Sequence, residues 1–134
     1  MAYCFDTDLI SAVLRRQPNL EVVRRLARIP AEQQFTTAIT LGELLYGAAR
    51  RGNEALAQRI RQLLADAVPI LPFDEEAADV YGPLRAGLEA AGKRLDEPDL
   101  RIASIALAHD LTLVTGNVRH FGRVPGLTIE DWLN

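Results

Sequence analysis

The chain has 134 residues, of which 49% are hydrophobic and 25% are charged, and its formal net charge is −3 at pH 7. This length is typical of one compact domain, and the balance of apolar and charged residues excludes an intrinsically disordered chain. We therefore expect a single domain over residues 1–134. The negative net charge excludes a basic field over the whole surface, so any binding to nucleic acid has to come from a local patch of cations.

The cysteine content and the absence of apolar targeting segments indicate where the protein acts. Its one cysteine, Cys4, lies in an apolar segment, cannot form an internal disulfide and is expected to be an inert core thiol. No segment reaches the ~20 apolar residues of a membrane span, and the opening residues do not match a secretion signal. We expect a cytoplasmic protein with no membrane association.

Short apolar strands alternate with amphipathic helices along the chain. In chain order we predict a strand at 2–5, helices at 7–16 and 20–29, a strand at 35–39, a helix from 40 to the residues before Gly52, a helix at 54–66, a strand at 68–71, helices at 75–91 and 96–109, and strands at 111–115 and 127–129. This alternation is typical of an α/β domain, here a mainly parallel sheet of four to five strands flanked by helices.

Three acidic residues and one asparagine are predicted to share one edge of this sheet. Asp6 follows the first strand, Glu43 falls in the first turn of the helix after the second strand, and Asn117 follows the fourth strand. In a parallel sheet these junctions lie at the carboxyl edge, where open α/β sheets keep their binding crevice. The helix that begins near Asp96 leads into the fourth strand, so it starts at this same edge and brings Asp99 there.

Each acid also has a simple structural explanation as a helix cap. Thr40 and Glu43 match a capping box, and Asp6 and Asp96 stand where N-caps are expected. The grouping of the acids at one edge favours a catalytic or metal-binding role over capping, because carboxylates on one rim raise one another's pKa unless a cation neutralises them. Hard oxygen ligands suit Mg²⁺ or Mn²⁺, and the sequence has no cluster of Cys and His for zinc.

A divalent cation on such a rim favours hydrolysis of a phosphodiester. It polarises a phosphoryl oxygen and lowers the pKa of a bound water, which are the two requirements of that reaction. The sequence contains no G-x-S-x-G, no Walker P-loop and no G-x-G-x-x-G. Acyl transfer and the common nucleotide-binding motifs therefore lack support.

Four segments of the chain form a set that covers almost its whole length. They read FDTDLIS, TTAITLGELLYGA, DEPDLRIASIALAHDLTLVTGNVRHF and VPGLTIEDW. In content, order and spacing the set resembles the PIN-domain ribonuclease toxins of the VapC type. The resemblance implies a parallel sheet flanked by helices, an RNA substrate, Mg²⁺ or Mn²⁺ as cofactor, and a cognate VapB-like antitoxin as inhibitor. It also implies that Asp6, Glu43 and Asp99 are the catalytic and metal-binding acids.

Several positions near these acids leave alternatives open. Asp8 stands where that family usually has Asn, and His120 stands where many members have a fourth acid, so the number of metal ions is open. His120 is interpreted as a contact to phosphate or as a packing residue. Asn117 matches a polar residue of the motif that orients water or a ligand, with a helix cap as the alternative. Asp96 lies one turn before Asp99 and is interpreted as a cap or as a supporting acid.

Two other functions fit part of the sequence. Asp6 and Asp8 form the D-x-D of haloacid-dehalogenase-like phosphatases, but Lys93, the only lysine, has no setting near a phosphate, and the chain is short for that fold. The second is a PIN-like domain that binds RNA or protein without cleavage, an alternative that His120 keeps open.

The helices predicted to start at Thr40 and at Glu54 carry more apolar side chains than one thin sheet is expected to cover. These apolar residues are Leu41, Leu44, Leu45, Ala48, Leu56, Ile60, Leu63 and Leu64. We expect a groove beside these helices that receives an amphipathic antitoxin segment, with a basic side chain of that segment reaching the acidic rim. The alternatives are that this surface packs internally or forms a homodimer.

Overall fold

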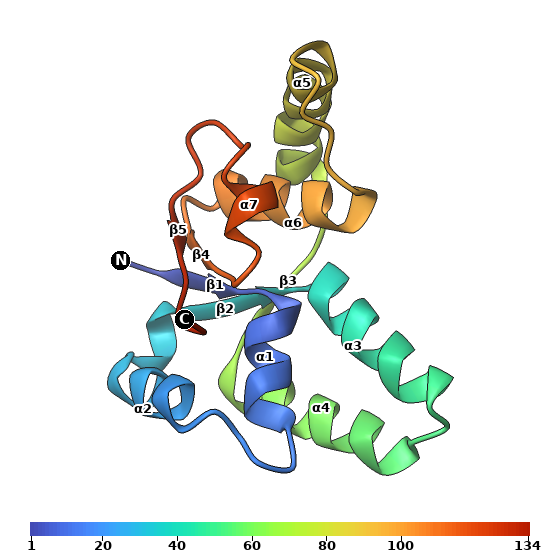
Figure 1. Ribbon diagram of the computed structural model, residues 1–134, viewed down its shortest axis with the longest axis vertical. Helices are drawn as coiled ribbons and strands as arrows, with labels where there is room; N and C mark the ends of the chain where they lie inside the picture. The colour runs from blue at the N-terminus through green and yellow to red at the C-terminus, as the bar shows by residue number, and fades with distance from the viewer.

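A five-stranded parallel sheet forms the centre of the computed structural model, which describes residues 1–134 (Figure 1). The strands are β1 (Tyr3–Phe5), β2 (Gln34–Thr37), β3 (Ile70–Leu71), β4 (Thr112–Val114) and β5 (Ile129–Glu130). Their order across the sheet is β3-β2-β1-β4-β5, and every neighbouring pair is parallel. The predicted α/β fold class is confirmed, with five strands.

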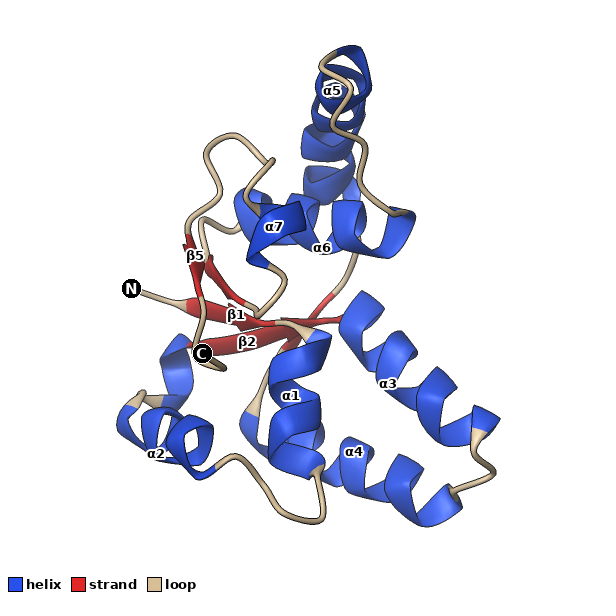
Figure 2. Cartoon of the chain, viewed as in Figure 1, coloured by secondary structure: helices blue, strands red, loops and turns tan.

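Helices cover both faces of this sheet. They are α1 (Thr7–Leu14), α2 (Leu20–Arg28), α3 (Ala38–Arg50), α4 (Glu54–Ala67), α5 (Glu75–Ala90), α6 (Glu97–Ala108) and α7 (Val118–Phe121), with a short 3-10 helix at Ala31–Gln33. In Figure 2 the sheet separates α1, α2 and α4 on one side from α5, α6 and α7 on the other. None of these helices has the length and apolar character needed to span a bilayer.

Alternate residues of the central strand β1 contribute to two separate cores. Cys4 packs with Ile102 and other residues of α6, whereas Phe5 packs on the opposite face with Leu9 of α1 and Ile60 of α4. This division follows from the alternation of side chains along a strand, and it explains why both faces of β1 are apolar. Complete burial raises the pKa of the Cys4 thiol, which keeps the thiol protonated and inert.

The start of α3 differs from the prediction. We expected the strand to run to Ile39 and the helix to begin at Thr40, with Thr40 and Glu43 as a capping box. In the structure Thr37 is the N-cap, and its Oγ1 accepts a hydrogen bond from the Thr40 backbone N–H at 3.0 Å. The run FTTAIT offers several residues with strand propensity, so propensity did not locate the boundary. The predicted capping box is therefore wrong. Glu43 lies in the second turn of α3, where its side chain does not cap the helix.

The outer strands are shorter than predicted or are shifted along the chain. β3 contains only residues 70–71 of the predicted 68–71, and β5 covers 129–130 in place of 127–129. β3 pairs only with the end of β2, and β5 only with the end of β4. An apolar run identifies candidate strand residues, but the neighbouring strand decides how many of them are paired.

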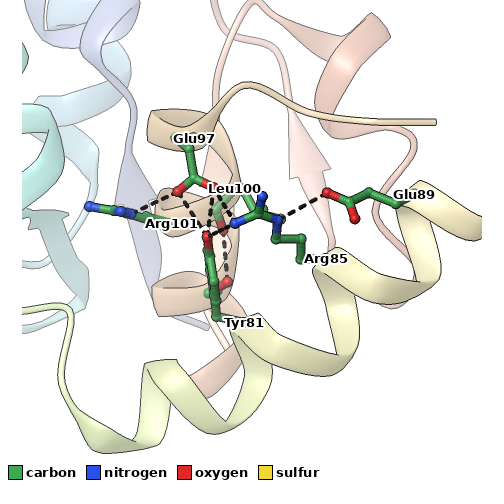
Figure 3. Close-up of polar contacts among 7 residues, drawn as sticks. Tyr81, Arg85, Glu89, Glu97, Leu100 and Arg101 are labelled. Carbon is green, nitrogen blue, oxygen red and sulfur yellow. Dashed lines mark hydrogen bonds and ion pairs between the residues drawn. The ribbon is translucent and has the colours of Figure 1, made fainter. Parts of the chain in front are cut away.

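A network of charged and hydroxyl groups fastens α5 to the first turn of α6 (Figure 3). The Tyr81 hydroxyl lies 2.6 and 2.9 Å from the two carboxylate oxygens of Glu97. Arg85 and Arg101 contact the same carboxylate at 3.0 and 3.1 Å. The hydrogen bond from Tyr81, together with both guanidinium groups, lowers the pKa of Glu97. The network therefore orients the part of α6 that carries Asp99.

Candidate active site

Asp6 is the only buried acid of the protein, and only 6% of its surface is exposed. It occupies the N-cap position of α1, but its side chain makes no capping hydrogen bond. Instead, the Thr115 hydroxyl donates to Asp6 Oδ2 at 2.7 Å. Burial, with repulsion from Asp8 and Asp99, raises the pKa of Asp6 to about 7, although the hydrogen bond from Thr115 lowers it.

The sheet register brings Asp6 and Thr115 together. Phe5 of β1 pairs with Val114 of β4, so the next residue of each strand meets the other at the carboxyl edge. Thr115 was not among the residues predicted from the sequence. The only signal available was a hydroxyl residue at the end of a predicted strand, and such a signal is informative only once the two strands are known to be neighbours.

Asp99 is half-buried in the first turn of α6. It is linked to Asn117, the N-cap residue of α7, and through Asn117 to His120. Asn117 Nδ2 donates to Asp99 Oδ2 at 3.4 Å, and Asn117 Oδ1 lies 2.6 Å from Nδ1 of His120. Because a carbonyl oxygen only accepts, Nδ1 of His120 carries the hydrogen and Nε2 remains for another partner. Burial and repulsion from Glu43 and Asp96 raise the pKa of Asp99, whereas the His120 imidazole lowers it.

Glu43 faces the site from α3. The Thr7 hydroxyl of α1 donates to Glu43 Oε1 at 2.7 Å. The effect of Glu43 on the pKa of Asp99 indicates that the two carboxylates lie within electrostatic reach of each other. Glu43 and Thr7 also line one end of a groove of about 290 Å³ between α1, α3 and α4.

Asp8 supports the turn that leads from β4 to Asn117. The Gly116 backbone N–H donates to Asp8 Oδ2 at 2.8 Å, and Asp8 Oδ1 is buried without a partner. A Cβ atom at Gly116 would lie 3.0 Å from Asp8 Oδ2 and 2.9 Å from Leu133 Cδ1. The absence of a side chain at Gly116 therefore permits this close approach. In the sequence Asp8 stood out as a departure from a family pattern and as part of a D-x-D, and its hydrogen bond to Gly116 was not predicted.

The capping interpretation does not describe what the polar side chains of this edge do. Asp96 is the N-cap residue of α6 and Asn117 that of α7, yet neither side chain makes a capping hydrogen bond. Asp96 is exposed, and its charge contributes to the raised pKa of Asp99. Asn117 instead bonds to Asp99 and His120.

The acids interact electrostatically but do not form a closed metal cage. No group of three or more His, Cys, Asp or Glu side chains lies close enough to hold a metal ion. The donor set is nevertheless suited to Mg²⁺, which is commonly held by one or two carboxylates while waters and substrate phosphates complete its coordination. The raised pKa values of Asp6 and Asp99 indicate the same fit. A bound cation would offset the cost of burying these charges and would reduce the repulsion between them.

Comparison with known protein families assigns this fold to a family. The family model of the PIN domain matches residues 3–127. The chain belongs to the PIN-domain family. This membership excludes the haloacid-dehalogenase-like alternative, and Lys93 is correspondingly exposed on the loop after α5. PIN-domain ribonucleases generally depend on a divalent metal.

Relatives of this PIN domain match it over nearly its whole length. Ribonuclease VapC2 of Rickettsia felis is 31% identical over 98% of both chains. Toxin FitB of Neisseria gonorrhoeae is 36% identical over 95% of this chain and 96% of its own. The crystal structure of VapBC2 from Rickettsia felis bound to a DNA fragment from their promoter contains a chain that matches with a TM-score of 0.88 and 30% identity, covering 98% of this chain and 99% of that one.

The raised pKa of Asp6 predicts how the stability of the metal-free PIN domain depends on pH. Between the ordinary value of 3.8 and the folded value of about 7, the folded state keeps a proton that the unfolded state has released. The free energy of unfolding should therefore fall as pH rises through this window and level off above it. Urea unfolding in EDTA across this range measures the slope.

Asp6→Asn removes this titration and should flatten the profile. Asp66→Asn, at an exposed position of α4, is the matched control and should retain the wild-type slope. Equal slopes for wild type and Asp6→Asn would show that Asp6 does not titrate in this window.

Proposed function

We propose that this PIN domain, over residues 1–134, is a metal-dependent ribonuclease and the toxin of a type II toxin–antitoxin pair. The observation that carries the proposal is the set of interacting carboxylates at the carboxyl edge of the sheet, in which Asp6 and Asp99 both have raised pKa values. Relatives named as ribonucleases and solved VapBC complexes support it. We also expect it to act in the cytoplasm and to form a homodimer.

In this proposal Asp6, Glu43 and Asp99 are the catalytic acids and bind Mg²⁺ or Mn²⁺ together with waters and substrate phosphates, because the three side chains by themselves do not enclose the ion. The bound cation supplies polarisation of a phosphoryl oxygen and a water of lowered pKa. The surrounding hydrogen bonds orient the carboxylates: Thr115 donates to Asp6 at 2.7 Å and Thr7 to Glu43 at 2.7 Å. These contacts hold the acids at the sheet edge before a cation or substrate arrives, which reduces the reorganisation needed for catalysis.

We assign His120 a supporting role rather than that of a fourth acid. Its Nδ1 hydrogen bond keeps the Asn117 amide turned so that Nδ2 donates to Asp99. The imidazole adds no negative charge to the rim, so it contributes less to a hard cation than a carboxylate would. Nε2 can donate to a phosphate oxygen of the substrate only in the protonated imidazole, in which both ring nitrogens carry a hydrogen.

The groove between α1, α3 and α4 supports the proposed antitoxin contact. Of the eight apolar residues singled out on α3 and α4, Leu44, Ala48, Ile60 and Leu64 are buried in the core, and the other four are half-buried against it. Leu44 and Ile60 also line the groove of about 290 Å³, which ends at Glu43. We propose that an amphipathic antitoxin segment occupies it and that a basic side chain of the segment pairs with Glu43.

Removal of any one of the three acids should abolish cleavage of RNA. We expect Asp99→Asn to lower the rate at least about 100-fold with the fold intact, since replacing a residue that merely supports a metal ligand costs ~10–100-fold. Asp6→Asn and Glu43→Gln should behave alike. The assay uses a mixed RNA pool with Mg²⁺, Mn²⁺ or EDTA, and Asp66→Asn is the control. A wild-type rate for Asp99→Asn would refute the site, and metal-dependent cleavage by wild type would exclude a non-catalytic PIN-like module.

His120→Ala should weaken cleavage less than any of these changes. We expect a loss of up to about 10-fold, at the lower end of the range for residues that support metal ligands. His120→Asn keeps a donor close to the position of Nδ1 and should recover part of the rate. A loss as deep as that of Asp6→Asn would contradict the supporting role.

Filling the groove should weaken antitoxin binding without harming the fold. Gly47 lines the groove, and a Cβ there would meet nothing within 4 Å, so the side chain of Gly47→Gln starts from unobstructed space at the groove. Gly42→Gln, on the same helix at a position outside the groove, is the matched control. The measurement is co-purification with the small protein encoded next to this gene and the resulting inhibition of RNA cleavage.

Full binding by Gly47→Gln would exclude this groove as the docking site. Failure of every adjacent small protein to bind the active wild-type nuclease would count against the toxin–antitoxin role.

A further inference from the structure

Three cations occur on α7 and on segments that lie next to it, and we call Lys93, Arg119 and Arg123 the basic strip. Arg119 lies within α7, and Arg123 follows one turn later. Arg123 Nη1 donates to the backbone carbonyl of Arg94 at 2.8 Å, which joins the α5–α6 loop to the segment after α7. Lys93 and Arg123 line the same cavity of about 240 Å³. Residues from two separate segments therefore form one surface.

The charges of the basic strip are not neutralised within the protein. None of its three cations forms an ion pair with a carboxylate, whereas Arg85 and Arg101 on neighbouring helices both pair with Glu97. Residues 118–129 contain no acidic side chain. In a protein whose net charge is −3, such a patch provides the local positive potential that the chain as a whole lacks.

The short helix α7 links the basic strip to the candidate active site. Arg119 is adjacent in sequence to His120, which bonds to Asn117, which in turn bonds to Asp99. A strand whose reacting phosphate lies at the acids carries further phosphates on either side, and the acids repel them. Cations beside the acids are therefore required to hold those flanking phosphates.

We propose that the basic strip binds backbone phosphates of the RNA strand on one side of the bond that is cleaved. This inference rests on the proposed ribonuclease function and specifies how its substrate is held. Guanidinium groups suit phosphate oxygens because their planar donors match two acceptors at once. Contacts of this kind position a strand without reading its bases, so they raise affinity equally for different sequences.

The test measures RNA binding and RNA cleavage separately in the full chain. The double variant Lys93→Gln/Arg119→Gln leaves the bond between Arg123 and Arg94 in place. Binding of a labelled single-stranded RNA is followed by fluorescence anisotropy in EDTA, where metal-dependent cleavage cannot proceed. We expect affinity to fall about threefold for each charge removed. The slope of log K against log salt should drop by about 0.7 for each phosphate that the variant no longer neutralises.

Cleavage kinetics supply the second measurement. The double variant should raise KM and leave kcat near the wild-type value, and the difference should vanish for an RNA too short to reach the strip. Arg61→Gln is the matched control, because Arg61 is exposed and unpaired on α4, which lies across the sheet from α7 (Figure 1). Lys93→Arg/Arg119→Lys, which keeps both charges, should bind RNA like the wild type.

The outcomes separate this proposal from the proposed function. If the wild type cleaves RNA and the double variant keeps the wild-type affinity for RNA and the wild-type salt slope, the basic strip does not bind RNA. This conclusion holds whether or not the strip contacts an acidic protein instead. An equal loss on short and long RNA would also overturn the proposal, because the strip would then act through the acids. If the wild type binds RNA through the strip but never cleaves it, the nuclease function fails and the binding surface stands.

Discussion

The burial of a carboxylate at the end of the central strand is the constraint on which the rest of the site depends. Because β1 lies between β2 and β4, the chain that leaves it is covered from several sides, and Asp6 is placed where solvent cannot stabilise its charge. Burial raises its pKa, and the neighbouring acids raise it further. The fold thus retains an unfavourable carboxylate that a cation would stabilise.

Hydrogen bonds from neutral side chains hold the acids in place without removing their charge. Thr115 bonds to Asp6, Thr7 to Glu43, and Asn117 to Asp99. An arginine or lysine in these positions would neutralise the carboxylates and compete with a metal. Hydroxyl and amide donors instead orient them and leave the negative potential of the edge available.

The distribution of cations matches this arrangement. Arginines that face carboxylates, such as Arg85 and Arg101, serve to join α5 and α6, whereas the cations of the basic strip have no carboxylate partner. A net charge of −3 is therefore compatible with a polyanionic substrate, because the charges are segregated by location. Because α7 follows β4, Arg119 of the strip is next in sequence to His120, which is linked to Asp99 through Asn117.

The alternation of strands and helices could be inferred from the sequence alone, and with it the parallel sheet and the shared edge of Asp6 and Asn117. These follow from local periodicity and from the geometry of parallel crossovers. The folded chain was needed to show that Thr37 caps α3, that Thr115 meets Asp6, and which apolar residues of α3 and α4 are buried. Those features depend on strand register and helix packing, and the free energies that select them come from contacts between residues far apart in the chain.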